Sequence, residues 1–165
     1  MRKDSRGFSL IELLIVVAII LIIAAIAIPN LLRSRIAANQ ASAVGSLRTL
    51  NTAEITYAST YNVGYSSDLL YLGPPAPGAN PTSTAAGLVD SILSGGGNNT
   101  STKSGYNFVY SPGSALNNRI DVYSFNANPT TPGTTGTNFY FTDQSGVIRQ
   151  NTTGTASSAD SPLAG

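Results

Sequence analysis

The sequence contains no cysteine and no histidine, and charged side chains are sparse. Without these two residues, the chain cannot form a disulfide scaffold, a thiolate or imidazole zinc site, a haem with an axial histidine, or a nucleophile activated by histidine. Charged residues make up 10% of the 165 positions, against about 25% in an ordinary soluble domain. Nine basic and eight acidic residues leave a formal charge of +1, so neither a nucleic-acid-binding arm nor an acidic tail is visible.

The apolar residues are concentrated in one long run near the N-terminus. Residues 1–7 are basic, and from Phe8 to Ile28 only Ser9 and Glu12 are polar. As an α-helix, these 21 residues span about 31 Å, which matches a hydrocarbon core of about 30 Å. Because no face of this helix is polar, it needs lipid or other apolar helices on every side.

A second helical pattern follows Pro29, where a kink or a local break is expected. Residues 30–63 are predicted to form an amphipathic helix that ends near Asn62–Gly64, with Gly64 as a left-handed C-cap. The predicted apolar stripe consists of Leu32, Ile36, Val44, Leu47, Leu50 and Ile55, flanked by Ala37, Ala41 and Ala58. The other faces are predicted to carry Arg33, Arg35, Asn39, Gln40, Arg48 and Asn51.

Residues 64–165 are rich in Gly, Pro, Ser, Thr and Asn, and predict a globular region of short strands and long loops. Loops are predicted at 73–81, 94–102 and 128–137, and a short helix at Ala86–Leu93. Strands are predicted at Tyr106–Tyr110, Arg119–Phe125, Asn138–Thr142 and Val147–Gln150, with a hairpin turn at 143–146. The predicted fold is therefore α+β, a long N-terminal helix whose amphipathic half covers a small antiparallel sheet.

A basic leader before an apolar run also fits a secretory signal peptide, and Ala25-Ile26-Ala27 offers a cleavage site for one. Two features count against this interpretation. The apolar run is longer than usual, and it contains the carboxylate of Glu12. An acidic residue costs about 2.5–3.5 kcal/mol for insertion at a helix centre and less near an end. Neither a removable segment nor a simple anchor needs such a residue.

A cationic partner explains why the apolar run contains the carboxylate of Glu12. If the chain is cut after Gly7, Phe8 becomes the N-terminus and carries a positive α-amine, with Glu12 one turn away at the i+4 position. In a bundle of copies, the carboxylate of one chain also meets the amine of the next. Unpaired charges in a low dielectric cost several kcal/mol, so a misregistered neighbour is disfavoured. The pattern therefore predicts an assembly signal.

The segment GFSLIELLIVVAIILIIAAIAIPN resembles the class III leader and N-terminal helix of type IV pilins and of type II secretion pseudopilins. The matching positions are Gly7 before the cut, Phe8 as first mature residue, Glu12 as fifth and Pro29 as twenty-second. The resemblance implies cleavage after Gly7 by a prepilin peptidase and N-methylation of Phe8. It also implies a filament of packed N-terminal helices, built by an assembly platform and a cytoplasmic ATPase.

The predicted function is that of a structural filament subunit, with no enzymatic activity, no cofactor and no specific nucleic-acid motif. Its partners are other copies of itself and, before assembly, the bacterial inner membrane, with the leader in the cytoplasm and the globular region outside. The filament then lies at the cell surface. Three alternatives stay open: a minor pilin, a type II secretion pseudopilin, or an exported binding or enzymatic domain on an N-terminal anchor.

Some secretion pseudopilins carry a calcium site, which makes Asp121, Asp143 and Asp160 weak candidate ligands. The D-x-D-x-D-G spacing of a calcium loop is absent, and Asp143 fits a hairpin turn more simply. Asn98, Asn99 and Asn151 lie in N-x-S/T patterns, which matter only in a host that glycosylates them.

Overall fold

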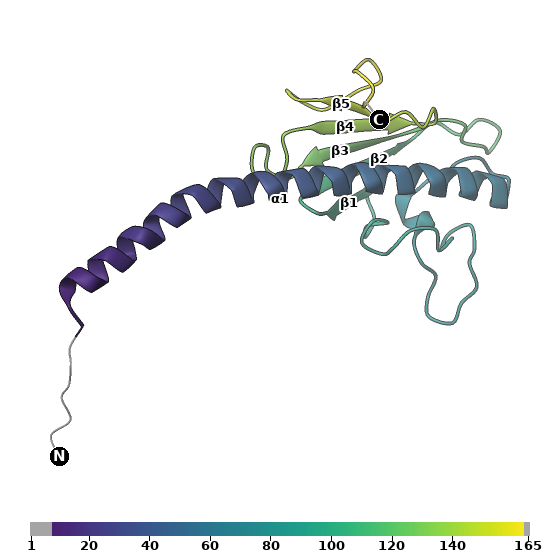
Figure 1. Ribbon diagram of the computed structural model, residues 1–165. Coiled ribbons are helices and arrows are strands. Elements are labelled where there is room, and N and C mark those ends of the chain that lie inside the picture. Colours follow the sequence, from purple (N-terminus) through teal and green to yellow (C-terminus); the bar gives the residue numbers. More distant parts are fainter. Residues whose placement is uncertain (1–7, 164–165) are drawn as a thin grey trace. The chain divides into compact units, whose positions relative to one another are not determined.

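The computed structural model describes residues 8–163 (Figure 1). The chain divides into two compact units, Met1–Arg35 and Ile36–Gly165. Helix α1 (Leu10–Tyr61) runs through the first unit and into the second. Among the described residues, the second unit adds a short 3-10 helix, η1 (Leu69–Leu72), and five strands. These are β1 (Thr100–Lys103), β2 (Tyr106–Pro112), β3 (Tyr123–Pro129), β4 (Phe139–Asp143) and β5 (Arg149–Asn151).

The five strands form one antiparallel sheet in the order β1-β2-β3-β4-β5, so each strand pairs with the next along the chain. In Figure 1, the part of α1 that belongs to the second unit lies across this sheet. The predicted α+β architecture, with a long N-terminal helix on a small antiparallel sheet, is confirmed.

Helix α1 continues through Pro29, so of the two expected outcomes, a kink or a local break, the break does not occur. Proline removes one backbone donor, and the bonds on either side maintain the helix. The helix ends at Tyr61, and Asn62 takes the left-handed conformation with φ 60°, donating its N–H to the Ala58 carbonyl at 3.2 Å. The C-cap prediction for Gly64 is therefore wrong, because asparagine also tolerates this conformation. Gly64 instead lies against the Ile120 carbonyl, where a Cβ would clash.

The core lies between one face of the sheet and the second half of α1. Alternating aromatic residues of two neighbouring strands fill this core: Tyr106, Phe108 and Tyr110 of β2 and Tyr123 and Phe125 of β3 are all buried. The antiparallel register places Tyr110 opposite Phe125, and their ring centroids are 4.6 Å apart. Side chains from α1 complete this core: Ala43, Leu47, Leu50, Ala53 and Tyr57.

The predicted apolar stripe on α1 is only partly correct. Leu47 and Leu50 are fully buried, but Ile55 is 59% exposed, and Asn51 is buried although it was predicted on a polar face. Asn51 is satisfied there, since its amide donates to Thr142 Oγ1 at 2.8 Å and its carbonyl accepts from Tyr123 Oη at 3.1 Å. A pattern that counts only apolar residues misses a buried face with paired polar groups.

The third strand is displaced along the sequence from its prediction. β3 begins at Tyr123 and continues to Pro129, into the segment predicted as loop, whereas Arg119 lies in a tight turn bonded to Leu116. Polar Asn126 and Asn128 alternate with buried residues along β3, so the strand has one polar face and lacks the continuous apolar signal.

Two further segments differ from their predictions. β1 lies in a segment predicted as loop; its composition is polar because it is an edge strand with one buried side chain, Ser101. Ala86–Leu93 is not helical. Its first backbone donors bond instead to carbonyls of residues 71–73, and Gly87 has φ 66°, which a helix does not accommodate.

The predicted β4–β5 hairpin is confirmed, although its connection is longer than four residues because β5 begins at Arg149. Its turn is closed by the Gly146 N–H, which donates to the Asp143 carbonyl at 2.9 Å.

Gly45→Ala should stabilise the protein, because Gly45 lies inside α1 and a Cβ there would meet no atom within 4 Å. Alanine favours a helix over glycine by about 1 kcal/mol, so the free energy of unfolding should rise by about that amount in denaturant titrations of the chain in detergent. Gly136→Ala is the matched opposite, since a Cβ there would clash with the Tyr106 side chain. An unchanged or lower stability for Gly45→Ala would contradict the helical packing assigned to this position.

Candidate functional site

The N-terminal part of α1 presents apolar side chains on all of its faces. Every large apolar residue from Leu10 to Ile28 is exposed in the isolated chain. The helix is long and apolar enough to cross a membrane. Leaving this much apolar surface in water is unfavourable, so the segment requires a nonpolar environment.

Ser9 and Glu12 form a capping box at the start of this helix. The Ser9 N–H donates to Glu12 Oε2 at 2.9 Å, and the Ile11 N–H donates to Ser9 Oγ at 3.3 Å. These bonds satisfy backbone donors that the first turn of a helix otherwise leaves unpaired, and the carboxylate lies at the positive end of the helix dipole. This capping role of Glu12 was not predicted, although Ser-x-x-Glu before an apolar run is the usual signature of a capping box.

Of the predicted assembly residues, the capping box brings Phe8 and Glu12 close together. Phe8, 81% exposed, directly precedes Ser9, whose N–H the Glu12 carboxylate holds. Among residues 8–163, Glu12 Oε1 accepts no hydrogen bond, so this oxygen can take a second donor. Pro29 lies inside α1, and Gly7 falls outside the described residues.

The three candidate calcium ligands each bond to neighbours of their own. Asp121 pairs with Arg119 at 2.6 Å, and Asp143 accepts from a backbone N–H of its own hairpin turn. Asp160 accepts from the Ser157 backbone N–H at 2.7 Å, and this bond lowers the pKa of its carboxyl. Within residues 8–163, no three Asp or Glu side chains converge as metal ligands do.

A buried carboxylate in the globular unit was not predicted. Glu54 of α1 is 0% exposed, and it accepts from Ser66 at both oxygens: the backbone N–H at 2.9 Å and Oγ at 2.7 Å. Tyr110 of β2 joins this group by donating to the Ser66 carbonyl through its hydroxyl. Glu54 thereby connects the helix, the segment after it and the sheet. Its position four residues after Leu50 and seven after Leu47 is the sequence signal that placed it on the buried face.

No cation faces Glu54 among the described residues, and its near neighbours are tyrosines. Burial raises the pKa of Glu54, and the hydrogen bonds from Ser66 oppose this shift only in part. Burial, followed by the negative charge of Glu54, also raises the pKa of Tyr57, Tyr110 and Tyr123, which come from α1, β2 and β3. Glu54, Ser66 and Tyr110 thus form a hydrogen-bonded link between structural elements, and they do not form a general acid and base pair.

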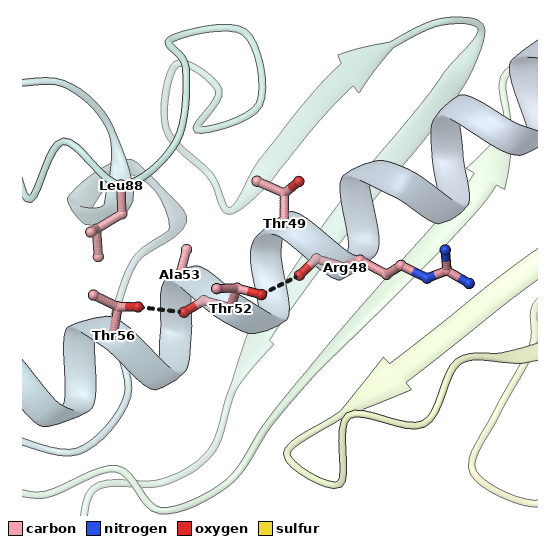
Figure 2. Close-up of a pocket in the computed structure, with 6 residues that line it drawn as sticks. All are labelled: Arg48, Thr49, Thr52, Ala53, Thr56 and Leu88. Carbon is pink, nitrogen blue, oxygen red and sulfur yellow. Dashed lines mark hydrogen bonds between the residues drawn. The ribbon is translucent and has the colours of Figure 1, made fainter.

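A hollow of about 310 Å³ lies along α1, and Figure 2 shows its lining. Thr52 Oγ1 donates to the Arg48 carbonyl at 3.0 Å, and Thr56 Oγ1 donates to the Thr52 carbonyl at 2.8 Å. Thr49 bonds to the Gly45 carbonyl in the same way. Since these hydroxyls donate to the helix itself, the lining of the hollow offers one cation, Arg48, and no general base. The apolar helix and its capping box are therefore the stronger candidate for the functional site.

Comparison with known proteins also identifies the N-terminal segment. The family model described as "Prokaryotic N-terminal methylation motif" matches residues 2–28. The type IV major pilin protein PilA of Myxococcus xanthus is 51% identical over 55 residues, which cover 33% of this chain and 25% of that protein. The type IV wide pilus major component PilA4 of Thermus thermophilus is 62% identical over 37 residues, which cover 22% of this chain and 28% of that protein.

These matches support the type IV pilin family for this chain. The chain spans about a quarter of the length of the curated pilins it matches. No solved structure matches it. The pilin resemblance predicted from Gly7, Phe8, Glu12 and Pro29 is confirmed at the level of the family.

Glu54→Gln should flatten the pH dependence of stability. The pKa of Glu54 is higher in the folded state than its ordinary value of 4.5. The contribution of Glu54 to the free energy of unfolding is therefore fully present below pH 4.5, and it is lost as the pH rises through the folded-state pKa. Unfolding free energies from pH 4 to 8 should therefore fall for the native chain more than for Glu54→Gln, which keeps an acceptor for Ser66.

Glu54→Ala is the control, since it leaves the Ser66 N–H without its acceptor and should destabilise the fold at every pH. Parallel pH profiles for the native chain and Glu54→Gln would show that Glu54 ionises in the fold as it does in water.

Proposed function

We propose that this chain is a structural subunit of a type IV pilus-like extracellular filament. A prepilin peptidase cleaves it after Gly7 and methylates the amine of Phe8. The subunit is held in the bacterial inner membrane by residues 8–29 until an assembly platform and its ATPase move it into the filament. The observation that supports this proposal is the exposed apolar segment of α1 with a carboxylate at its start, on a helix that continues into a folded α+β unit.

The mechanism is a change of surroundings for the apolar segment. Lipid surrounds it before assembly, and the same segment of neighbouring copies surrounds it afterwards. Both surroundings are apolar, so the hydrophobic effect favours neither strongly. Close packing of alanine and β-branched side chains and the pairing of Glu12 must therefore favour the bundle. Extraction of the segment from the membrane requires external work.

The capping box gives Glu12 two roles within this mechanism. Oε2 binds the Ser9 N–H of its own chain, which fixes the carboxylate at the helix start. Oε1 is then available to the Phe8 amine, in the same copy or in a neighbour. A charged hydrogen bond of this kind is stronger than a neutral one, and its loss in an apolar bundle leaves an uncompensated charge. The register of neighbouring copies depends on it.

The pilus subunit is favoured over the pseudopilin because both relatives are named as major components of type IV pili. The segments that carry the function are a leader (1–7), a core helix (8–29), an amphipathic helix (30–63) and a globular region (64–165). In the filament, the Gly-, Pro-, Ser- and Thr-rich loops of the last segment form the surface.

Glu12→Gln separates the charge of Glu12 from its capping role. Glutamine at this position still accepts from the Ser9 N–H, as it does in capping boxes generally, but it cannot form an ion pair with the Phe8 amine. Filament yield, measured by shearing and electron microscopy, should fall at least tenfold for Glu12→Gln and for Glu12→Val, while membrane insertion stays normal or improves.

Glu12→Asp is the matched control, because it keeps the charge on a shorter side chain and should restore part of the yield. Normal filaments from Glu12→Gln would leave helix capping as the whole role of this residue.

Gly7→Val should block maturation, because the peptidase is proposed to cut directly after this small residue. N-terminal sequencing of the native protein should give a methylated Phe8, and the variant should keep Met1. Ser34→Val is a suitable control for added bulk elsewhere. A variant chain that still begins at Phe8 would place the recognition outside Gly7, and a native chain that begins at Ile28 would favour a signal peptide.

A further inference from the structure

Arg33 and Arg35 are the first charged residues after Glu12, and both lie in the same compact unit as the apolar segment. Both side chains are exposed. Among the described residues, neither forms a salt bridge, whereas Lys103 and Arg119 are each paired with an aspartate. Arg33 and Arg35 therefore have no anionic partner within residues 8–163.

The spacing of these arginines matches the thickness of a membrane. Residues 13–32 contain no charge, and as an α-helix these 20 residues span about 30 Å, the thickness of the hydrocarbon core. With that run in the hydrocarbon, Arg33 and Arg35 begin about 1.5 and 4.5 Å beyond its edge. The headgroup region extends about 5–7 Å on each side, so both guanidinium groups fall within the layer of phosphates.

The angular positions of the two residues favour a partner that surrounds the helix. Two residues along an α-helix correspond to a rotation of about 200°. Arg33 and Arg35 therefore point to nearly opposite sides, and a single flat protein surface cannot contact both. A layer of lipid headgroups contacts both at once.

We propose that Arg33 and Arg35 bind the phosphodiester groups of anionic phospholipids in the outer leaflet, and that this contact sets the depth of the unassembled subunit. The inference rests on the proposed membrane stage. Guanidinium groups suit this role because they bind phosphate oxygens through two parallel hydrogen bonds and stay charged. Processing after Gly7 removes Arg2, Lys3 and Arg6 from the cytoplasmic side, so the outer pair then provides the side-chain cations next to the membrane.

The chain offers a direct test because it has no native cysteine. Ser34→Cys, between the two arginines, carries a fluorophore on the full chain reconstituted in vesicles of phosphatidylcholine with 30% phosphatidylglycerol. Quenching is measured with spin-labelled phosphatidylglycerol and with the matching phosphatidylcholine. Protease protection of the globular region reports insertion separately.

The native arginines should make phosphatidylglycerol the stronger quencher, with an enrichment of about fivefold for each arginine at low salt that declines as salt is added. Arg33→Gln/Arg35→Gln should remove this preference and leave insertion intact. Arg48→Gln, in the globular unit, should keep the preference. Equal quenching by the two lipids with both arginines present, or a preference that survives the double substitution, would overturn the inference. Failure of the chain to insert in either lipid would overturn the membrane stage and this inference with it.

Discussion

From Leu13 to Ile28 helix α1 has no polar face, and the behaviour of the chain depends on how that surface is covered. A soluble domain could cover it only by wrapping the segment, but all of its large side chains are exposed in the single chain. The surroundings must therefore come from outside, and in the proposed function they are lipid at one stage and other copies at another. Since both are apolar, the proposal leaves the position and register of the segment to the polar groups at its ends. Glu12 lies at one end, and Arg33 and Arg35 lie at the other.

The globular unit uses a different balance of forces. Its part of α1 is held by an aromatic and aliphatic core, together with buried polar side chains that have partners on the sheet. Asn51 bonds to β3 and β4, and Glu54 bonds to the segment that follows the helix. Such groups contribute little net stability, but they cost much when misplaced. They fix one helix rotation against the sheet, which apolar contacts alone leave adjustable.

The sequence predicted the features that depend on strong periodicity or on composition. The apolar helix, its amphipathic continuation, the aromatic strand β2 and the β4–β5 hairpin all carry such signals. The strands with weak signals were displaced or missed: β1 is polar because it lies at an edge, and β3 alternates asparagine with buried residues.

In the candidate site, the importance of Glu12 followed from the cost of a charge in an apolar run, whereas its capping role was missed although Ser-x-x-Glu is the usual signature of one. The spacing from Leu47 and Leu50 indicates the buried face for Glu54, but its hydrogen bonds come from Ser66, which is linked in turn to the distant Tyr110. No local pattern predicts such a meeting, because the partners are brought together only by the packing of the helix on the sheet. The same holds for Asn51, which a count of apolar residues assigned to the wrong face.

The meander order leaves the sheet with two edge strands, β1 and β5. An unpaired edge invites a strand from another molecule, and proteins crowded side by side are at particular risk. Both edges carry protection against this. β1 has only four residues, all polar, and one of them is Lys103. Beside β5, the Gln150 N–H already donates to the Ser161 carbonyl, so the chain's own tail occupies that edge. Both features disfavour edge-to-edge pairing between the sheets of separate copies, which is the route to an amyloid-like ribbon.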